Sequence, residues 1–415
     1  MLRHITAILA LGACLAGQST VTDRPDGRHL STRGSVQAMM NRHLPELQFN
    51  PGYSPAEFKA WQERMRTEMA RIMKHPAKQS AVPVKVKSVK RDGYRVEKWE
   101  SYPLPESVVP FLVLIPDGAD ASSPADFAAL CIPGFGQTKE MLAGEVGGNY
   151  NLEGEPDPKA GKGAMALQYV KQGLVAVAVD NPSFGELSDN GYSDYLTSSR
   201  FLLEQGWSYL GLSSWQDRVV LDWMKEQPFI NRNRIIASGF SLGTEPMMAI
   251  GLLDPEIYAF VYNDFMCRTR ERILVMTRPD ENGNRAFPNS IEHLIPGFLN
   301  QFDFPDIVAA LAPRPVICTE GGLDRDFKII KEAYTKAGAA DNFTFHHYEK
   351  FKDSSARQNI ENLPEGIDMA TYFRLCNVDP PHHYFKTEHV IPWLTELRKK
   401  ITTLSIIRSD VAPKR

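Results

Sequence analysis

The chain has 415 residues, of which 43% are hydrophobic, and a formal net charge of −3. This length suits one large α/β domain with extensions or two small domains, and it can bury a sizeable core. The nearly balanced charge provides neither a basic face for nucleic acid nor an acidic tail, so we expect no nucleic-acid partner.

The N-terminus has the features of a targeting segment. A basic start precedes an apolar run that ends at Cys14, which is typical of an export signal and too short to span a bilayer. We therefore predict a signal peptide over residues 1–17 and a protein that is periplasmic, surface-attached or secreted. Residues 11–14 also resemble a bacterial lipobox, which would place a lipid anchor on Cys14. Ordinary cleavage near Ala16, which discards Cys14, stays open.

The other cysteines predict no special chemistry. Cys131 and Cys318 stand in apolar, strand-like runs, where a buried free thiol is the usual state. Cys267 and Cys376 share no CxxC spacing with them, so we predict neither a metal site nor a redox pair, and no cofactor.

An N-terminal arm and one amphipathic helix are expected over residues 18–80. The arm, residues 18–53, is polar and lacks periodicity. Ser54 and Glu57 then form a capping box around Pro55, which begins a helix. Its apolar residues recur at helical spacing, at Phe58, Trp61, Met65, Met69 and Ile72.

A catalytic domain is expected over residues 81–402, followed by a tail over 403–415. Its early strands are arranged like hairpins, and its later strands alternate with helices, which predicts a mostly parallel sheet with helices on both faces. The strands are expected near 84–90, 94–101, 108–115, 127–132, 173–179, 234–239, 257–262, 315–320 and 343–348, and the clearest helices at 207–226 and 243–253.

The pattern Gly-Phe-Ser-Leu-Gly at residues 239–243 lies between a predicted strand and a predicted helix. The chain must turn there within about two residues, which forces the serine into strained geometry and exposes its hydroxyl at a helix N-terminus. Gly239 and Gly243 permit the close approach of strand and helix. We predict that Ser241 is a nucleophile and that the Leu242 N–H stabilises an oxyanion.

A second oxyanion donor is expected after the strand at 127–132. The loop Pro133-Gly134-Phe135-Gly136 lets the backbone turn its amides, and the Phe135 N–H is the best candidate. A plain tight turn is the alternative interpretation of this loop.

An acid should follow the next-to-last strand, where its carboxylate can orient a histidine. Asp324 lies just past Gly321 and Gly322 and is the first choice. Asp326 and Asp264, the latter after the preceding strand, remain alternatives.

The base should be a histidine late in the chain. His382 and His383 lie in a Pro-rich loop before the last helix, and we choose His383, with His382 as a substrate contact or packing residue. His346 and His347, in a predicted strand, and His389, in the last helix, are the other candidates.

The order Ser, Asp, His on one predicted sheet resembles the α/β-hydrolase superfamily. Within it the chain is most similar to bacterial acetyl xylan esterases and dienelactone hydrolase-like esterases, from about Lys59 to Lys399. The resemblance implies the α/β-hydrolase fold and a serine esterase without a metal, often acting on acetylated sugars. The closer likeness is carried by residues 211–217, 293–297, 306–307, 312–315, 322–324, 383–385 and 393–394.

The chain also departs from this pattern. Pro133 replaces the usual histidine of the oxyanion loop, and Glu245 stands where small residues are common. Glu245 is expected to cap its helix or to contact a substrate hydroxyl, and Gly136 and His382 are further candidate substrate contacts. The polar segment 349–381 is expected to be an inserted lid or rim. A serine peptidase of the same fold and a non-catalytic binding lipoprotein are the competing functions.

Overall fold

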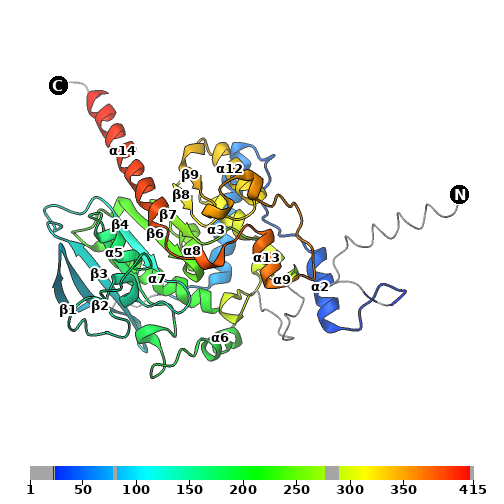
Figure 1. Cartoon of the computed structure of the whole chain (residues 1–415), viewed down its shortest axis with the longest axis horizontal. Helices are drawn as coiled ribbons and strands as arrows, with labels where there is room; N and C mark the ends of the chain where they lie inside the picture. The colour runs from blue at the N-terminus through cyan, green and yellow to red at the C-terminus, as the bar shows by residue number, and fades with distance from the viewer. Residues whose placement is uncertain (1–21, 23, 78–81, 276–288, 412–415) are drawn as a thin grey trace.

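A computed structural model describes residues 22, 24–77, 82–275 and 289–411. The predicted signal peptide and Cys14 therefore lie outside the described residues. A nine-stranded sheet forms the centre of the molecule, in the order β1-β2-β3-β5-β4-β6-β7-β8-β9 (Figure 1). The pairs from β1 to β5 along this order are antiparallel, and those from β5 to β9 are parallel. This arrangement confirms the mostly parallel sheet.

All nine predicted strands are present in the described part of the chain. β8 and β9 end earlier than expected, so Glu320 and His346 lie just beyond strands. The bounds are β1 Val84–Arg91, β2 Tyr94–Leu104, β3 Ser107–Pro116, β4 Ala128–Ile132, β5 Val175–Val179, β6 Ile235–Phe240, β7 Ala259–Asn263, β8 Val316–Cys318 and β9 Phe343–Phe345.

The predicted helices at 207–226 and 243–253 are present as α7 and α8, and others fill the connections. The bounds are α2 Thr32–Arg42, α3 Pro55–Met73, α4 Lys139–Ala143, α5 Met165–Val170, α6 Tyr195–Glu204, α7 Tyr209–Glu226, α8 Thr244–Leu253, α9 Thr269–Val275, α10 Phe298–Gln301, α11 Phe304–Ala310, α12 Asp324–Lys336, α13 Met369–Leu375 and α14 Thr387–Val411.

Helix α3 begins as the sequence predicts. The Ser54 side chain accepts from the Glu57 N–H, and the Glu57 carboxylate accepts from the Ser54 N–H, which completes the capping box. Its apolar face is buried, and Trp61 donates from Nε1 to the Leu47 carbonyl at 2.8 Å. The arm before it differs from the expectation, because it contains α2, which stands at the N-terminal side of the molecule (Figure 1).

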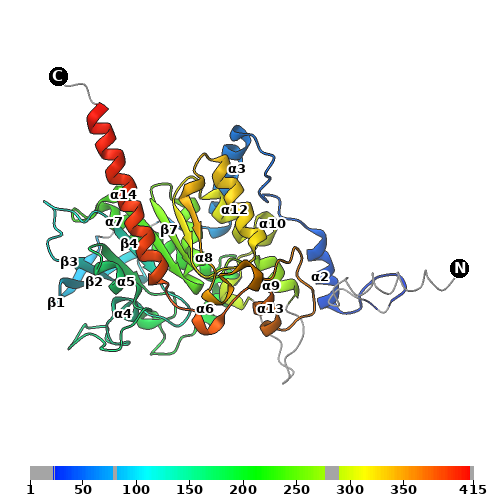
Figure 2. The ribbon, with the colours of Figure 1, turned by 45° about the horizontal axis from the view of Figure 1, so that its top comes forward.

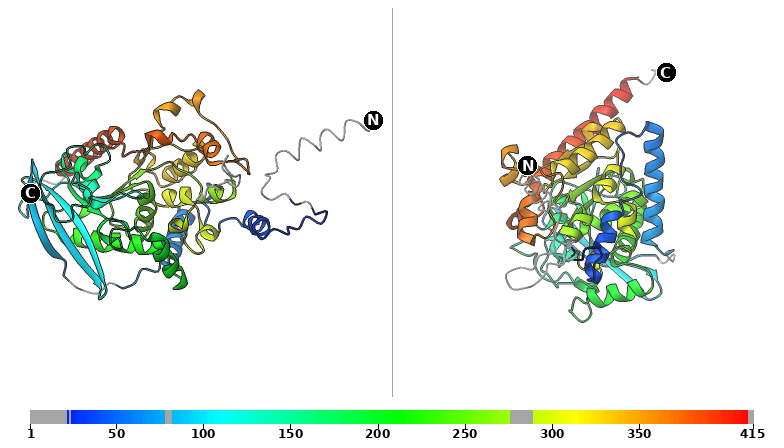
Figure 3. Two further views of the ribbon diagram at one scale, coloured as in Figure 1. Left: turned by 60° about the horizontal axis from the view of Figure 1, so that its bottom comes forward. Right: turned by 90° about the vertical axis from the view of Figure 1, so that its right-hand side faces the viewer.

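Alternate residues of the strands pack on opposite faces of the sheet. Val177 and Ala237 belong to one buried cluster with residues of α3, α7, α8, α11 and α12. Ala176 and Ile236 belong to the other, with residues of α4, α5 and α14. Figure 2 shows α14 crossing over the strands, and Figure 3 shows β1 to β3 as the antiparallel end of the sheet. This period-two burial is what a sheet covered on both faces requires.

The end of the last helix differs from the expectation. Helix α14 runs to Val411, past the domain end predicted at residue 402. Among the helices in the described ranges, none is both long and apolar enough to cross a bilayer.

Candidate active site

Ser241 lies in the sharp turn between β6 and α8. Its φ is 51°, a left-handed conformation that a non-glycine residue adopts only under strain. A Cβ on Gly239 would lie 2.4 Å from the Gly243 carbonyl oxygen, and one on Gly243 would lie 2.4 Å from the Ile132 carbonyl oxygen. Both glycines are therefore required by the close packing of β6, α8 and β4. The local geometry is that of a nucleophile elbow.

Ser241 opens into a pocket of about 250 Å³ at the carboxyl ends of the parallel strands. The predicted residues Phe135, Leu242, Glu245 and His383 line the same pocket as Ser241. The remaining lining residues are Asp264, Phe265, Arg272, His293, Tyr348, Phe373, Val378 and Pro380. Phe373, Val378 and Pro380 come from the segment 349–381, so this segment forms part of the pocket wall.

The loop after β4 is held from behind by Asn181. This buried side chain follows β5, and its Nδ2 donates to the carbonyl oxygens of Pro133 at 3.0 Å and of Gly134 at 3.3 Å. The Gly134 carbonyl also accepts from the Gln137 N–H at 3.2 Å. Because a trans peptide directs its C=O and N–H to opposite sides, the Phe135 N–H points away from Asn181.

Gly134 is in contact with the nucleophile turn. A Cβ placed on it would lie 3.2 Å from the Ser241 Cβ and 2.8 Å from the Phe240 ring. The peptide that carries the Phe135 N–H is therefore beside Ser241. Gly136 has a φ of 77° and turns the chain after Phe135, but it does not line the pocket.

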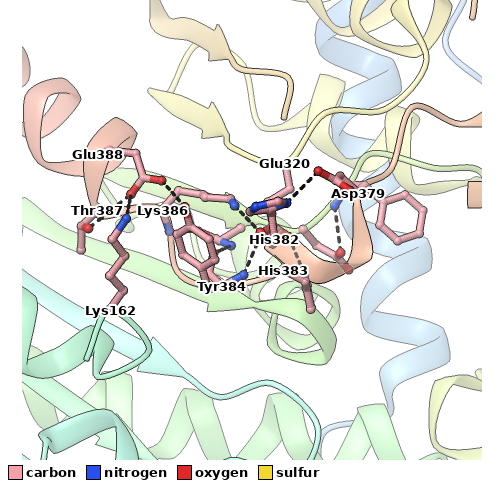
Figure 4. Close-up of polar contacts among 12 residues, drawn as sticks. Lys162, Glu320, Asp379, His382, His383, Tyr384, Lys386, Thr387 and Glu388 are labelled. Carbon is pink, nitrogen blue, oxygen red and sulfur yellow. Dashed lines mark hydrogen bonds and ion pairs between the residues drawn. The ribbon is translucent and has the colours of Figure 1, made fainter. Parts of the chain in front are cut away.

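His383 is held by a glutamate. Its Nδ1 lies 2.5 Å from Oε2 of Glu320, and the Tyr384 N–H donates to Oε1 of the same carboxylate at 3.1 Å (Figure 4). Glu320 is fully buried, and Lys386 Nζ lies 3.5 Å from its Oε1. The His383 ring stacks on Phe240, with ring centroids 4.6 Å apart. Because Phe240 directly precedes Ser241 in the chain, this stacking brings His383 close to Ser241. An imidazole bound at Nδ1 leaves Nε2 as the atom that can exchange a proton.

Asp264 is a second carboxylate beside His383. Ligand atoms of Asp264, Glu320 and His383 all lie within 4.8 Å of one another, so the three groups could also hold a cation. Burial raises the pKa of Asp264 to about 6, although His383 opposes the shift. Burial disfavours the protonated form of His383, but the carboxylates of Glu320 and Asp264 outweigh it and raise the His383 pKa. Both acids therefore stabilise an imidazolium at His383.

The structure does not bring Asp324 to His383, which corrects the predicted acid. Asp324 Oδ1 lies 3.0 Å from His347 Nε2, and its Oδ2 accepts from Arg357 Nε at 3.1 Å. The physical reason is the length of β8, which ends at Cys318, so that Asp324 already begins α12. The alternative acid, Asp326, is buried, and its Oδ1 accepts a hydrogen bond from Arg268 Nε at 2.7 Å.

The other histidines have different surroundings. The His382 ring is exposed, and its Nδ1 lies 2.8 Å from Asp379 Oδ2 (Figure 4). His346 and His389 stack on each other with ring centroids 4.0 Å apart, in a groove between β9 and α14. His382, His346, His347 and His389 are not among the residues that line the Ser241 pocket.

A further acid–histidine pair lies in the pocket. Glu245, in the first turn of α8, has its Oε1 2.8 Å from Nδ1 of His293. His293 ends a short 3₁₀ turn, Ile291–His293. The Glu245 side chain therefore points to this turn.

Sequence reasoning missed three residues of the site. Glu320 and Asn181 each follow a buried strand by two residues, at the sheet edge where the carboxyl ends of parallel strands meet. That position is a usable signal for functional polar residues. His293 lies in one of the stretches that carry the family resemblance, but its place in the pocket depends on the fold of a long connection.

Cys131 and Cys318 are buried free thiols, as expected, and so are Cys267 and Cys376.

Comparisons with known proteins show the family to which the chain belongs. The model of the Abhydrolase family matches residues 16–396. A crystal structure from Bacteroides fragilis NCTC 9343, described as a candidate acetyl xylan esterase, is 54% identical, with 91% of this chain and 97% of that chain covered and a TM-score of 0.86. A methylesterase structure is 19% identical, with 77% of this chain and 64% of that chain covered and a TM-score of 0.52, which supports the fold alone. No curated protein matches the chain. With the family model extending over most of its length, the chain belongs to the Abhydrolase family and has the α/β-hydrolase fold.

Proposed function

We propose that this chain is a serine carboxylic-ester hydrolase in which Ser241, His383 and Glu320 act together. The observation that carries the proposal is the positive φ of Ser241 beside a histidine that is bound through Nδ1 to a buried carboxylate. A strained serine at a helix N-terminus, next to a base that a third group orients, is the arrangement used for nucleophilic catalysis on carboxyl groups.

In the first half of the reaction, the Ser241 hydroxyl attacks the ester carbonyl carbon and its proton passes to His383 Nε2. The carbonyl oxygen becomes an oxyanion, which accepts hydrogen bonds from the N–H groups of Phe135 and Leu242. The intermediate collapses, the C–O bond to the alcohol breaks, and His383 returns the proton to the departing alcohol. The acyl group stays on Ser241.

In the second half, His383 takes a proton from water, and the hydroxide formed attacks the acyl carbon. The second oxyanion occupies the same hole. On its collapse the bond between the acyl carbon and Ser241 Oγ breaks, His383 gives its proton to Oγ, and the carboxylic acid leaves. Glu320 keeps the His383 tautomer with Nε2 free and stabilises the imidazolium in both halves.

The proposed substrate class rests on the similar Bacteroides protein, because 54% identity over almost the full length of both chains places the two in one family. We propose that the substrate is a carbohydrate ester, with acetylated sugars or other small esters as the acyl donors. The pocket of about 250 Å³ is small, which favours a short acyl chain.

The test is a substrate panel together with an active-site label. The purified protein is assayed with p-nitrophenyl esters of increasing acyl length and with acetylated xylo-oligosaccharides. A fluorophosphonate probe is expected to label Ser241, and Ser241→Ala is expected to keep the fold while turnover falls by about 10⁴–10⁶. Hydrolysis of peptide substrates without ester hydrolysis would favour the peptidase alternative. Neither activity, with no labelling, would favour a binding protein.

A further inference from the structure

The Glu245–His293 pair is separate from the proposed acid–base assembly and has no part in the mechanism above. Glu245 Oε1 lies 2.8 Å from His293 Nδ1, whereas Glu320 holds His383. Both members of the pair line the Ser241 pocket. A second polar group in an ester pocket that takes no part in the chemistry is placed to recognise the substrate.

Glu245 has an unused acceptor. The residue is 8% exposed, and within the described ranges no donor reaches its Oε2, which is buried. A buried acceptor without a hydrogen bond destabilises the folded protein, and more so when the group is charged. Since Glu245 forms part of the pocket wall, a bound molecule can supply the donor that the protein does not.

The charges around Glu245 limit what that donor can be. Burial disfavours the protonated form of His293, but Glu245 outweighs this effect and raises the His293 pKa. Arg272 adds a guanidinium to the same pocket wall. A cationic ligand would be repelled by these two groups, and an anionic ligand would be repelled by the Glu245 carboxylate. A neutral donor, such as an alcohol hydroxyl, is repelled by neither.

We propose that Glu245, held in place by His293, accepts a hydrogen bond from a free hydroxyl of the substrate near the scissile ester. The site then selects esters of polyols, such as partly acetylated sugars, over esters without a neighbouring hydroxyl. This inference rests on the proposed esterase function. A pocket built to bind a hydroxyl rejects the analogue that lacks it strongly, because its own polar group is then left unpaired.

The experiment is a double-mutant cycle in which one change is made in the enzyme and the other in the substrate. kcat/KM is measured for a mono-acetylated methyl xyloside and for each of its deoxy analogues, with the wild-type protein and with Glu245→Leu and Glu245→Gln. For at least one deoxy position, the wild-type protein is expected to prefer the hydroxylated ester by about 100-fold, or on the order of 2.7 kcal/mol. Glu245→Leu is expected to reduce that preference at least tenfold, with Glu245→Gln between the two. If Glu245→Leu does not fold, Glu245→Gln alone supports the same comparison.

A matched control is Glu292→Gln. Glu292 is also buried and its carboxylate lies 3.9 Å from His293 Nε2, but it does not line the pocket. This variant is expected to keep the preference for the hydroxylated ester. Equal kcat/KM on hydroxylated and deoxy esters, or a preference that survives Glu245→Leu, overturns the inference while ester hydrolysis itself stands. If no ester is hydrolysed, the proposed function fails first and the inference fails with it.

Discussion

The Nδ1 atom of His383 and the Oε2 atom of Glu320 lie 2.5 Å apart, although the two residues are 63 positions apart in the chain. Glu320 follows β8, and His383 lies in the loop before α14. Asn263, at the end of β7, fixes that loop from the other side. Its Nδ2 donates to the Tyr384 carbonyl at 3.1 Å, and its Oδ1 accepts from the Lys386 N–H at 2.7 Å. The position of the imidazole is therefore set by two neighbouring strands.

The first prediction concerns Glu320. The proposed base must be neutral to accept a proton, so kcat/KM is expected to rise with pH through the raised pKa of His383. Glu320→Gln removes a negative charge beside the ring, which lowers that pKa and moves the acid limb of the pH profile to lower pH. The plateau is expected to fall by about 10²–10⁴, because the imidazolium loses its stabilising partner. Steady-state kinetics between pH 5 and 9 measure both effects.

Two comparison variants separate the acids. Asp264→Asn also removes a negative charge near His383, so it is expected to shift the acid limb in the same direction but to lower the plateau less than Glu320→Gln. Asp324→Asn is expected to leave the acid limb in place, because its carboxylate lies at His347 and Arg357. An acid limb that moves with Asp324→Asn and not with Glu320→Gln would refute the assignment of Glu320.

The second prediction separates the adjacent histidines. His383→Ala is expected to lower kcat about as far as Ser241→Ala, because residues that act as a unit lose activity together. His382→Ala removes an exposed ring that contacts Asp379, and kcat/KM is expected to stay within about tenfold of the wild type. The reverse pattern would make His382 the base. Circular dichroism of each variant checks that the fold is kept.

The third prediction concerns Asn181. Asn181→Asp keeps the shape of the side chain but replaces a donor to two carbonyl oxygens with a carboxylate that repels them. The loop after β4 is then expected to lose the orientation of the Phe135 N–H. Loss of one oxyanion donor costs about 10²–10³ in kcat, and KM should change much less.

A matched control for this variant is Asn377→Asp. Asn377 is also buried, and its Nδ2 donates to the carbonyl oxygens of Gly322 and Gln358. It therefore reports the general cost of a charge at a buried asparagine. Equal losses of kcat in the two variants, in proportion to their losses of stability, would show that Asn181 has no specific role at the oxyanion loop.

The fourth prediction concerns export. If Cys14 carries a lipid, the protein expressed in a bacterial host partitions into the detergent phase, and Cys14→Ala does not. If the signal is cleaved without a lipid, both proteins stay in the aqueous phase and their N-termini begin near residue 17. An intact Met1 on the mature protein would contradict both forms of the prediction. Phase partition and N-terminal mass analysis provide the measurements.

Much of the fold could be predicted from the sequence, because buried strands appear in it as short apolar runs. The runs at β4, β5 and β6 are short, apolar and bounded by turn residues, and no alternative element fits them equally well. Ser241 could also be predicted, because its Gly-x-Ser-x-Gly pattern lies between a predicted strand and a predicted helix, where close packing needs both glycines. The helix α2 was not predictable in this way, because few of its residues are buried and apolar periodicity is absent.

The proposed acid, Glu320, and the residue that supports the loop after β4 were harder to predict, because both assignments depend on where strands end. Whether Glu320 or Asp324 reaches the histidine is decided by where β8 stops, and an apolar run does not mark its last residue. Asn181 is recognised only once β5 is known to lie beside β4, so that its side chain reaches Pro133 and Gly134. Neighbour order in a sheet is a tertiary property that one sequence leaves open.

The strained backbone at Ser241 carries a trade-off between stability and turnover. A left-handed serine costs of the order of 1–3 kcal/mol, and the surrounding packing of β6, α8 and β4 must supply that energy. Ser241→Gly relieves the strain at the cost of about 0.4–1 kcal/mol of extra freedom in the unfolded chain, so it should leave an inactive protein about 1 kcal/mol more stable than Ser241→Ala. Natural selection on thermal resistance alone would therefore remove the proposed nucleophile, and its retention at this position would mark selection for chemistry.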